Sequence, residues 1–249
     1  MDELYWYAEW DKSQTALVDY REERFSVMID ILRSVAVNNI RVLDLGCGPG
    51  STSLRVLESV DKATVVSVDY DPVLLKIARR VLNKFGSGSM IVEADLSAPG
   101  WEEKLPLRSF DAVVSTTALH WINENALEKL YKHCFEMLSP NGIFLNGDHI
   151  HPAAEDERVK MFYDSVRHRM ERENLRRLQA LDWDAWWKSI GNDPMFSKEM
   201  KIRSERYGMG DHDKNVTLER HMDLLRRAGF SLIDVVWKAL DNRILMAVK

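Results

Sequence analysis

Apolar and polar positions along this chain alternate between the pattern of buried strands and that of amphipathic helices. Continuous apolar runs such as Ala112-Val113-Val114 are expected of strands that are buried on both faces. Strand patterns recur at about 40–45, 64–69, 90–94, 110–115 and 142–148. Apolar residues at helical spacing predict helices between them, at about 51–60, 72–85 and 123–138. This alternation predicts an α/β fold with a parallel sheet and helices on both of its faces.

The N-terminal region reads as a helical cap over residues 1–36. Apolar residues at spacings near 3.6 predict one helix over 14–35, with a single stripe formed by Leu17, Tyr20, Phe25, Met28, Leu32 and Val35. An aromatic cluster precedes it, formed by Tyr5, Trp6, Tyr7 and Trp10. We expect these aromatic residues, with Tyr7 among them, to lie over a substrate pocket.

After about residue 150 the alternation stops, and it resumes near residue 214. A helix is predicted at about 154–181, with one apolar face formed by Val159, Phe162, Val166 and Met170. A helix at 216–228, capped by Gly229, then precedes strands at about 231–240 and 243–248 with a tight turn at Asp241-Asn242. We therefore expect a core of 37–150 and 214–249, closed by an antiparallel hairpin, and a helical lid inserted at 151–213.

Composition excludes several classes of protein. The 249 residues suffice for one domain with an insertion, 45% of them are hydrophobic, and 29% are charged, as in ordinary globular proteins. The net charge of −5 argues against an extended nucleic-acid surface. Cys47 and Cys134 form neither a disulfide framework nor a zinc motif, and we expect no metal site. No apolar run has the length of a membrane span and no signal peptide is visible, so we expect a cytoplasmic protein.

The segment of residues 42–50 carries the clearest functional signal. An apolar strand leads into a loop with glycine at every second position, Gly46-x-Gly48-x-Gly50, and a helix pattern follows at once. Glycines let the backbone approach a ligand, and the helix N-terminus offers unpaired N–H groups. The spacing differs from the dinucleotide fingerprint, and Asp44 beside the loop would repel a pyrophosphate. A carboxylate there suits a ligand that carries an ammonium or sulfonium group.

This segment resembles motif I of the class I S-adenosylmethionine (SAM) dependent methyltransferases, over about 37–150 and 214–249. The resemblance implies a Rossmann-like, seven-stranded, mostly parallel sheet with a C-terminal antiparallel hairpin, and SAM as cofactor with S-adenosylhomocysteine as product. It places Gly46, Cys47 and Gly48 against the methionine and ribose of SAM. Asp44 matches the acid that helps to hold the methionyl part, and it equally suits an acid that caps the N–H groups of the loop.

Acids also stand at the ends of the next two strands. Asp69 ends the second strand and can accept both ribose hydroxyls, whereas Asp71 reads as the N-cap of the next helix. The resemblance implies that Tyr70 lies beside the adenine. It also implies that Asp95 accepts a hydrogen bond from the adenine amino group and that the N–H of Leu96 donates to the ring. The alternative is that Asp95 is a solvent-exposed acid at the end of its strand.

The fourth strand leads into the segment that is expected to border the sulfonium, from Thr116 to Trp121. This stretch is similar to that of small-molecule methyltransferases such as trans-aconitate methyltransferase. His120 is the candidate general base, needed only if the acceptor carries a proton; the alternative is a histidine that packs on Trp121. Trp121, His149 and Trp186, with Tyr7 and His120, are the candidate acceptor-binding residues, although tryptophans of the lid also suit its own core.

The leading interpretation is therefore a SAM-dependent methyltransferase for a small-molecule acceptor, reacting at oxygen, nitrogen or a carboxylate by in-line displacement. The chain lacks the Asn/Asp-Pro-Pro-Tyr/Phe and Pro-Cys patterns of enzymes that methylate nucleobases or glutamine. A tRNA- or protein-modifying methyltransferase and a non-catalytic SAM-binding protein remain as alternatives. We expect a monomer or a homodimer without membrane association.

Overall fold

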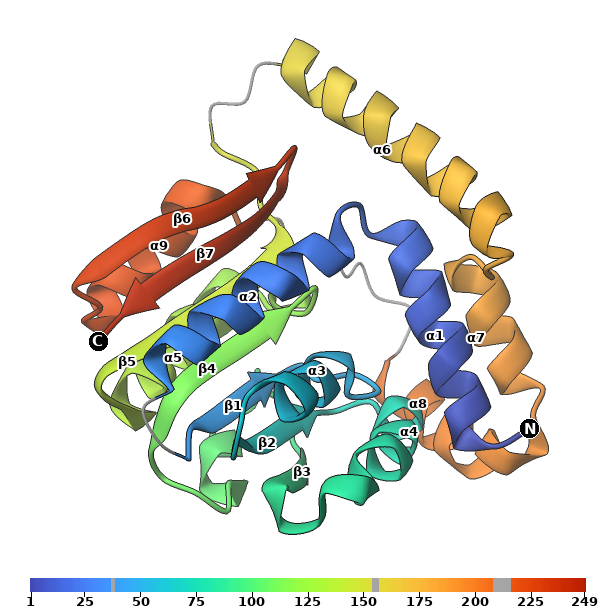
Figure 1. The fold of residues 1–249 in the computed structure, drawn as a ribbon, viewed down its shortest axis with the longest axis horizontal. Helices are drawn as coiled ribbons and strands as arrows, with labels where there is room; N and C mark the ends of the chain where they lie inside the picture. The colour runs from blue at the N-terminus through green and yellow to red at the C-terminus, as the bar shows by residue number, and fades with distance from the viewer. Residues whose placement is uncertain (37–38, 154–156, 208–215) are drawn as a thin grey trace.

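One seven-stranded sheet organises the molecule (Figure 1). The computed structural model describes residues 1–36, 39–153, 157–207 and 216–249. The strand order is β3-β2-β1-β4-β5-β7-β6. The strands are β1 Arg41–Leu45, β2 Thr64–Asp69, β3 Ser89–Glu93, β4 Phe110–Thr116, β5 Leu138–His149, β6 Leu232–Ala239 and β7 Asn242–Val248. The order reverses between β1 and β4, and sheets of this kind bind ligands beyond the carboxyl ends of the strands at such a switch point.

The sequence prediction of the sheet is confirmed. β1 to β5 pair in parallel, and β7 runs antiparallel to both β5 and β6. β5 and β7 place Asp148 opposite Arg243, and His149 opposite Asn242. Because successive strand residues point to opposite faces, Asp148 and His149 project to different sides of the sheet.

Two helical layers cover the sheet, because its strands are apolar on both faces. On one face, Met28 and Leu32 of α2 (Arg21–Val35) and Val56 of α3 (Ser51–Ser59) pack on the sheet. On the other face, Leu130 of α5 (Glu124–Met137) and Leu224 of α9 (Leu218–Ala228) do so. A third cluster joins α1 (Glu3–Leu17), α4 (Pro72–Leu82) and α7 (Trp183–Gly191) at one end of the sheet. Short 3₁₀ turns lie at Asn83–Gly88, Trp101–Lys104, Leu119–Trp121 and Pro194–Phe196.

The prediction of one helix over residues 14–35 is wrong. α1 ends at Leu17, and α2 begins at Arg21 after Tyr20 adopts a left-handed conformation with φ of 53°. Asp19 in this corner is buried, and its carbonyl accepts a hydrogen bond from Asn242 Nδ2 at 2.5 Å. Arg24 on α2 donates to Asn242 Oδ1 at 2.9 Å. The chain therefore turns so that the start of α2 can bind the final hairpin.

The inserted segment is helical, as predicted, but its long helix is not packed as predicted. α6 (Glu157–Leu178) extends along the outside of α1 and has no buried residue. Of its expected apolar face, Phe162 is 70% exposed. α7 and α8 (Ser197–Arg206) instead pack against α1 and α4 (Figure 1). The insertion thus divides into an outlying helix and a part bound to the core.

Two expectations from composition concern cysteine and the membrane. Cys47 and Cys134 are both buried and are not joined in a disulfide. In the part of the chain that the structure describes, no helix combines the length and apolarity that are needed to cross a bilayer.

Candidate functional site

The glycine loop after β1 folds tightly against β2. The N–H groups of Gly46 and Cys47 donate to Val68 O at 2.8 and 3.0 Å. Gly46 has φ of +71°, and a Cβ there would lie 2.4 Å from the Cβ of Ala118. Gly48 has φ of +56°, but a Cβ there would meet only Leu74 Cδ1, at 3.9 Å. Gly46 is therefore required for packing, whereas a Cβ at Gly48 would have room.

Asp44 is fully buried beneath this loop. Its Oδ2 accepts a hydrogen bond from Ser53 Oγ at 2.6 Å, and Ser53 also bonds Ser67. Its Oδ1 is buried without a hydrogen-bond partner among the described residues. Desolvation raises the pKa of Asp44 to about 7, and the charge of Asp69 adds to this shift. A cationic group at Oδ1 would restore the ionised form, which fits a role in holding a ligand ammonium.

Asp69 organises the loop from the end of β2. Its Oδ2 accepts from Gly48 N at 2.7 Å, and its Oδ1 accepts from Tyr70 N at 2.7 Å and Asp71 N at 2.8 Å. Burial raises the pKa of Asp69 to about 6, although these hydrogen bonds oppose the shift. As predicted, Asp71 caps α4 through Val73 N and Leu74 N. Any ribose contact of Asp69 would use the lone pairs that these N–H groups leave.

The region expected to receive adenine is bounded by the insertion. Arg206 at the end of α8 donates to Tyr70 O and to Glu93 Oε1, both at 2.5 Å, and its guanidinium lies 4.3 Å from the ring centroid of Tyr70. The ring of Tyr207 contacts Tyr70 at 6.1 Å. Burial raises the pKa of Tyr207, and the nearby charges of Asp71 and Asp69 add to it. Tyr207 therefore stands close to the expected ribose acid.

The remaining predicted cofactor residues stay on the same edge of the sheet. Asp95 is partly exposed, and its Oδ1 accepts from Ser97 N at 2.8 Å. Leu96 packs partly buried against the α5/α9 core. Thr116 Oγ1 lies 2.7 Å from the Oγ1 of Thr52, at the first turn of α3. The structure thus brings the ends of β1, β2, β3 and β4 together around the glycine loop.

His120 is held by a buried carboxylate. Its Nδ1 lies 2.9 and 3.0 Å from the two oxygens of Asp148, at the end of β5. Burial tends to raise the pKa of Asp148, but the charge and hydrogen bond of His120 and the charge of Arg24 lower it below its ordinary value. An ionised Asp148 favours the tautomer with the proton on Nδ1 and the lone pair on Nε2. This arrangement is suited to a general base.

The surroundings of the His120–Asp148 pair are partly polar. Trp121, at 48% exposure, has its ring 4.9 Å from that of His120. Asn146 and Arg243 project to the same face of the sheet as Asp148, and both are buried. The amide atoms of Asn146 and the Nε and Nη1 of Arg243 have no hydrogen-bond partner within the described ranges. Buried donors of this kind need a polar partner, such as a carboxylate or water.

Two predicted acceptor-binding residues lie elsewhere. His149 projects to the α2 face, away from Asp148, and lies 3.5 Å from Asp19 and 3.3 Å from Asp241. Trp186 is 1% exposed and packs between Trp6, Trp10 and Trp187, at ring distances of 5.9, 4.8 and 4.9 Å. We therefore correct both assignments: strand alternation turns His149 away, and Trp186 belongs to the aromatic core between α1 and α7.

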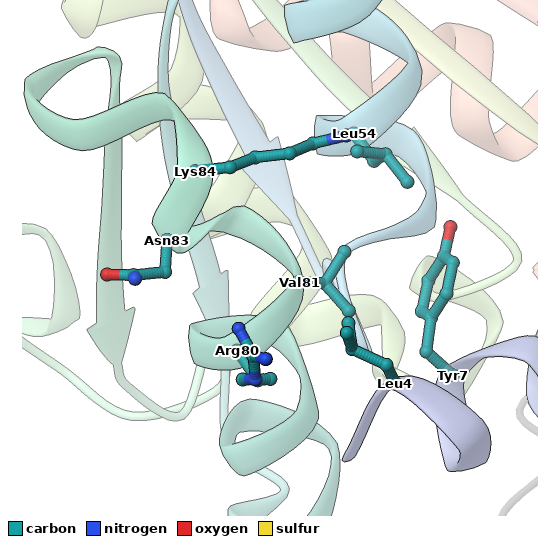
Figure 2. Close-up of a pocket in the computed structure, with 7 residues that line it drawn as sticks. All are labelled: Leu4, Tyr7, Leu54, Arg80, Val81, Asn83 and Lys84. Atoms are coloured by element: carbon teal, nitrogen blue, oxygen red, sulfur yellow. The ribbon is translucent and has the colours of Figure 1, made fainter. Parts of the chain in front are cut away.

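Tyr7 joins the cap to the cofactor loop. Tyr7 is partly buried on α1, and burial and the charge of Asp11 raise its pKa. Tyr7 also lines a cavity of about 370 Å³ between α1, α3 and α4, to which Leu4, Leu54 and Val81 contribute (Figure 2). No residue of the glycine loop lines that cavity.

Sequence reasoning missed the partners of several site residues. The sequence pattern does not single out Asp148, yet this residue binds His120, 28 positions earlier in the chain. Arg206 and Tyr207 lie in the insertion, where no motif marks them. An acid at a strand end with a histidine at the end of the neighbouring strand is the one signal that could have revealed the Asp148–His120 pair.

Comparison with known proteins agrees with this geometry. Residues 42–142 match the model of a methyltransferase domain family. The chain is 26% identical over 137 residues to trans-aconitate 2-methyltransferase of Escherichia coli, covering 55% of this chain and 49% of that protein. The relative of Escherichia fergusonii is 27% identical over 134 residues, covering 53% and 49%. This chain thus spans about half the length of these curated relatives.

Solved structures show the same fold. The alignment with a SAM-dependent methyltransferase structure from Methanococcus maripaludis covers all of this chain and 93% of that chain, with a TM-score of 0.58 and 14% identity. The pyocyanin biosynthetic protein PhzM has a TM-score of 0.57 and 18% identity, over 89% of this chain and 53% of its own. The family match over residues 42–142, the glycine loop and the strand order together support a class I SAM-dependent methyltransferase domain.

Proposed function

We propose that the chain transfers the methyl group of SAM to a small-molecule acceptor by in-line displacement. The observation that carries this proposal is the bond between His120 Nδ1 and buried Asp148, beyond the carboxyl ends of β4 and β5. In such sheets the reacting groups gather at this edge. His120 Nε2 would accept the proton of a hydroxyl or ammonium acceptor as the methyl group moves.

The cofactor is held, on this proposal, by groups from four strand ends. Asp44 faces the methionyl ammonium, and the glycine loop with Cys47 lies along the methionine and ribose. Asp69 accepts from the ribose, and Tyr70, Asp95 and Leu96 surround the adenine. Thr116 lies near the sulfonium. Methyl transfer from a cationic sulfur then depends mainly on holding donor and acceptor in line, at roughly 3 Å.

A carboxylate acceptor is the second candidate, supported by one observation. Asn146 and Arg243 present buried, unpartnered polar atoms on the face of Asp148, as far as the described residues show. The relative from Escherichia coli is named for trans-aconitate, a carboxylic acid. A carboxylate needs no deprotonation at neutral pH, so in that reaction His120 would position the acceptor without accepting a proton.

A screen for S-adenosylhomocysteine release tests the proposal. Hydroxylated, amine and carboxylic acid metabolites should be tested with SAM, with Gly48→Val as a control for cofactor-independent signal. Turnover by the wild-type protein and none by Gly48→Val is the expected result. Binding of S-adenosylhomocysteine without turnover of any acceptor class would instead indicate a SAM-binding protein without catalysis.

With an acceptor in hand, His120→Gln separates the two candidates. Loss of a general base lowers kcat by roughly 10²–10⁴-fold. A variant that raises KM but keeps kcat would indicate the carboxylate reaction. Activity only on a tRNA or protein substrate would contradict the small-molecule assignment.

A further inference from the structure

A group of three ionisable side chains, two of them buried, lies near the end of β5, apart from the His120–Asp148 pair. Asp19 comes from the corner between α1 and α2, His149 from the end of β5, and Asp241 from the turn between β6 and β7. One potential ligand atom from each lies within 4.8 Å of the others. Three segments that are distant in sequence therefore converge on one point.

The carboxylates of this group are poorly satisfied. The side chain of Asp19 is 1% exposed, and neither of its oxygens has a hydrogen-bond partner in the described structure. Asp241 Oδ1 and His149 Nδ1 also lack one there. Burying a carboxylate without hydrogen bonds or an ion pair is costly, so these atoms call for a bound partner.

The neighbouring basic side chains with described contacts lie mainly at Asp241. Arg167 of α6 donates to Asp241 Oδ2 at 2.8 Å, and His151 Nε2 lies 3.4 Å from the same oxygen. In the described part of the chain, the Asp19 carboxylate has one ion-pair neighbour, His149 Nε2 at 3.5 Å. Among the described contacts, the only guanidinium that forms an ion pair with either of the two carboxylates is that of Arg167, with Asp241.

We propose that Asp19, His149 and Asp241 bind one divalent transition-metal ion. Two carboxylates with an imidazole form a mixed oxygen and nitrogen donor set, which suits Zn²⁺, Mn²⁺ or Fe²⁺. Ca²⁺ is disfavoured, because it takes about 6–8 oxygen ligands. Two atoms bound at about 2.1 Å from one ion lie at most ~4.2 Å apart, so small side-chain rotations complete the site.

The ion would join the N-terminal helices to the sheet and to the last hairpin. It would also fix the backbone of His149, whose N–H donates to Asp148 Oδ1 at 2.9 Å. The metal site is thereby connected to the carboxylate that orients His120, although none of its ligands touches His120 in the described contacts. The competing explanation is a protonated His149 that bridges the two carboxylates without any metal.

Metal titration of the chelator-treated, full-length protein distinguishes these explanations, and it requires no methyl acceptor. Co²⁺ is the probe, because its visible d–d bands report ligands directly, and Zn²⁺ should displace it. We expect saturation at one Co²⁺ per chain. A wild-type protein that shows no saturable Co²⁺ absorbance would overturn the proposal, independently of any variant.

Variants then locate the ion. Asp19→Asn and His149→Gln should each weaken Co²⁺ binding by more than about 10-fold. His133→Gln is the matched control, because His133 also lies near two carboxylates, Glu102 at 3.5 Å and Glu136 at 3.9 Å, but on the surface of α5. The Co²⁺ affinity of the His133→Gln variant should equal that of the wild-type protein. Wild-type binding by both Asp19→Asn and His149→Gln, or a loss confined to His133→Gln, would refute the assignment.

Discussion

His120 and Asp148 lie 28 positions apart and meet at the carboxyl ends of neighbouring strands, with Nδ1 2.9 Å from Oδ1. Asp148→Asn would replace the acceptor of the Nδ1 proton with an amide and favour the wrong imidazole tautomer. We expect kcat to fall by at least about 10-fold and less than in His120→Gln. Cofactor affinity, measured by calorimetry with S-adenosylhomocysteine, should change little, because the described hydrogen bonds of Asp148 go to His120 and the His149 N–H and not to the glycine loop. An equal loss of cofactor affinity would contradict this role.

Gly46 and Gly48 should respond differently to substitution. Gly48→Val should fold, because a Cβ there meets only Leu74 at 3.9 Å, and strain at positive φ costs about 1 kcal/mol. It should nevertheless abolish SAM binding, because the side chain enters the space along the loop. Gly46→Ala should lower the melting temperature strongly, because its Cβ would lie 2.4 Å from that of Ala118. Thermal unfolding and calorimetry on both variants check this contrast.

Asp44 should make the ligand-free protein less stable as the pH rises. Its pKa of about 7 in the folded state exceeds the ordinary value of 3.8, so the folded protein retains a proton that the unfolded chain has lost. The free energy of unfolding therefore falls between about pH 4 and 7, by on the order of 2–4 kcal/mol from this group.

Asp44→Asn removes that titration. The variant should gain stability relative to wild type between pH 5 and pH 8, and it should bind SAM more weakly at pH 8. Denaturant unfolding at both pH values, together with calorimetry, measures the two effects. An unchanged difference in stability between the two pH values would show that Asp44 does not titrate in this range.

Trp186 should be a stability residue. Trp186→Ala empties a buried position among three aromatic rings, so we expect a loss of about 3–5 kcal/mol. Trp183→Ala is the control, because Trp183 is 39% exposed on the same helix and should cost about 1 kcal/mol or less. Equal losses would mean that the aromatic core is not centred on Trp186.

The two parts of the insertion should exchange amide hydrogens at different rates. α6 has no buried residue. α8 is joined to the α4 region by two ion pairs, Arg203 with Asp71 and Glu199 with Lys76. We expect rapid exchange in 157–178 and slow exchange in 183–206 without ligand. Mass spectrometry of exchanged peptides measures this difference. Uniformly rapid exchange over both parts would instead support a lid that moves as one unit.

Much of the fold was predictable because local patterns determine it. The apolar runs gave the seven strands, and Asp71 with Pro72 marked the start of α4. The acids at strand ends could be placed near the glycine loop because parallel strands end at one edge. The break at Tyr20 was not predictable, because it serves contacts with Asn242 that a helical period cannot show.

The site was less predictable where residues act through distant partners. Alternation along β5 separates Asp148 from His149, but the choice of face depends on the register with β7. The burial of Trp186 depends on Trp6 and Trp10, about 180 positions away in sequence. Composition could indicate an aromatic cluster, but only packing decides whether it lines a pocket or fills a core.

The bond between Arg24 and Asn242 has a consequence for synthesis of the protein on the ribosome. Arg24 emerges 218 residues before its partner. Until β7 has been translated, α2 cannot make this contact, and Met28 and Leu32 lack part of the apolar surface that later covers them. Part of the apolar face of α2 therefore stays uncovered until the last hairpin has been made, and such transiently exposed surface favours aggregation.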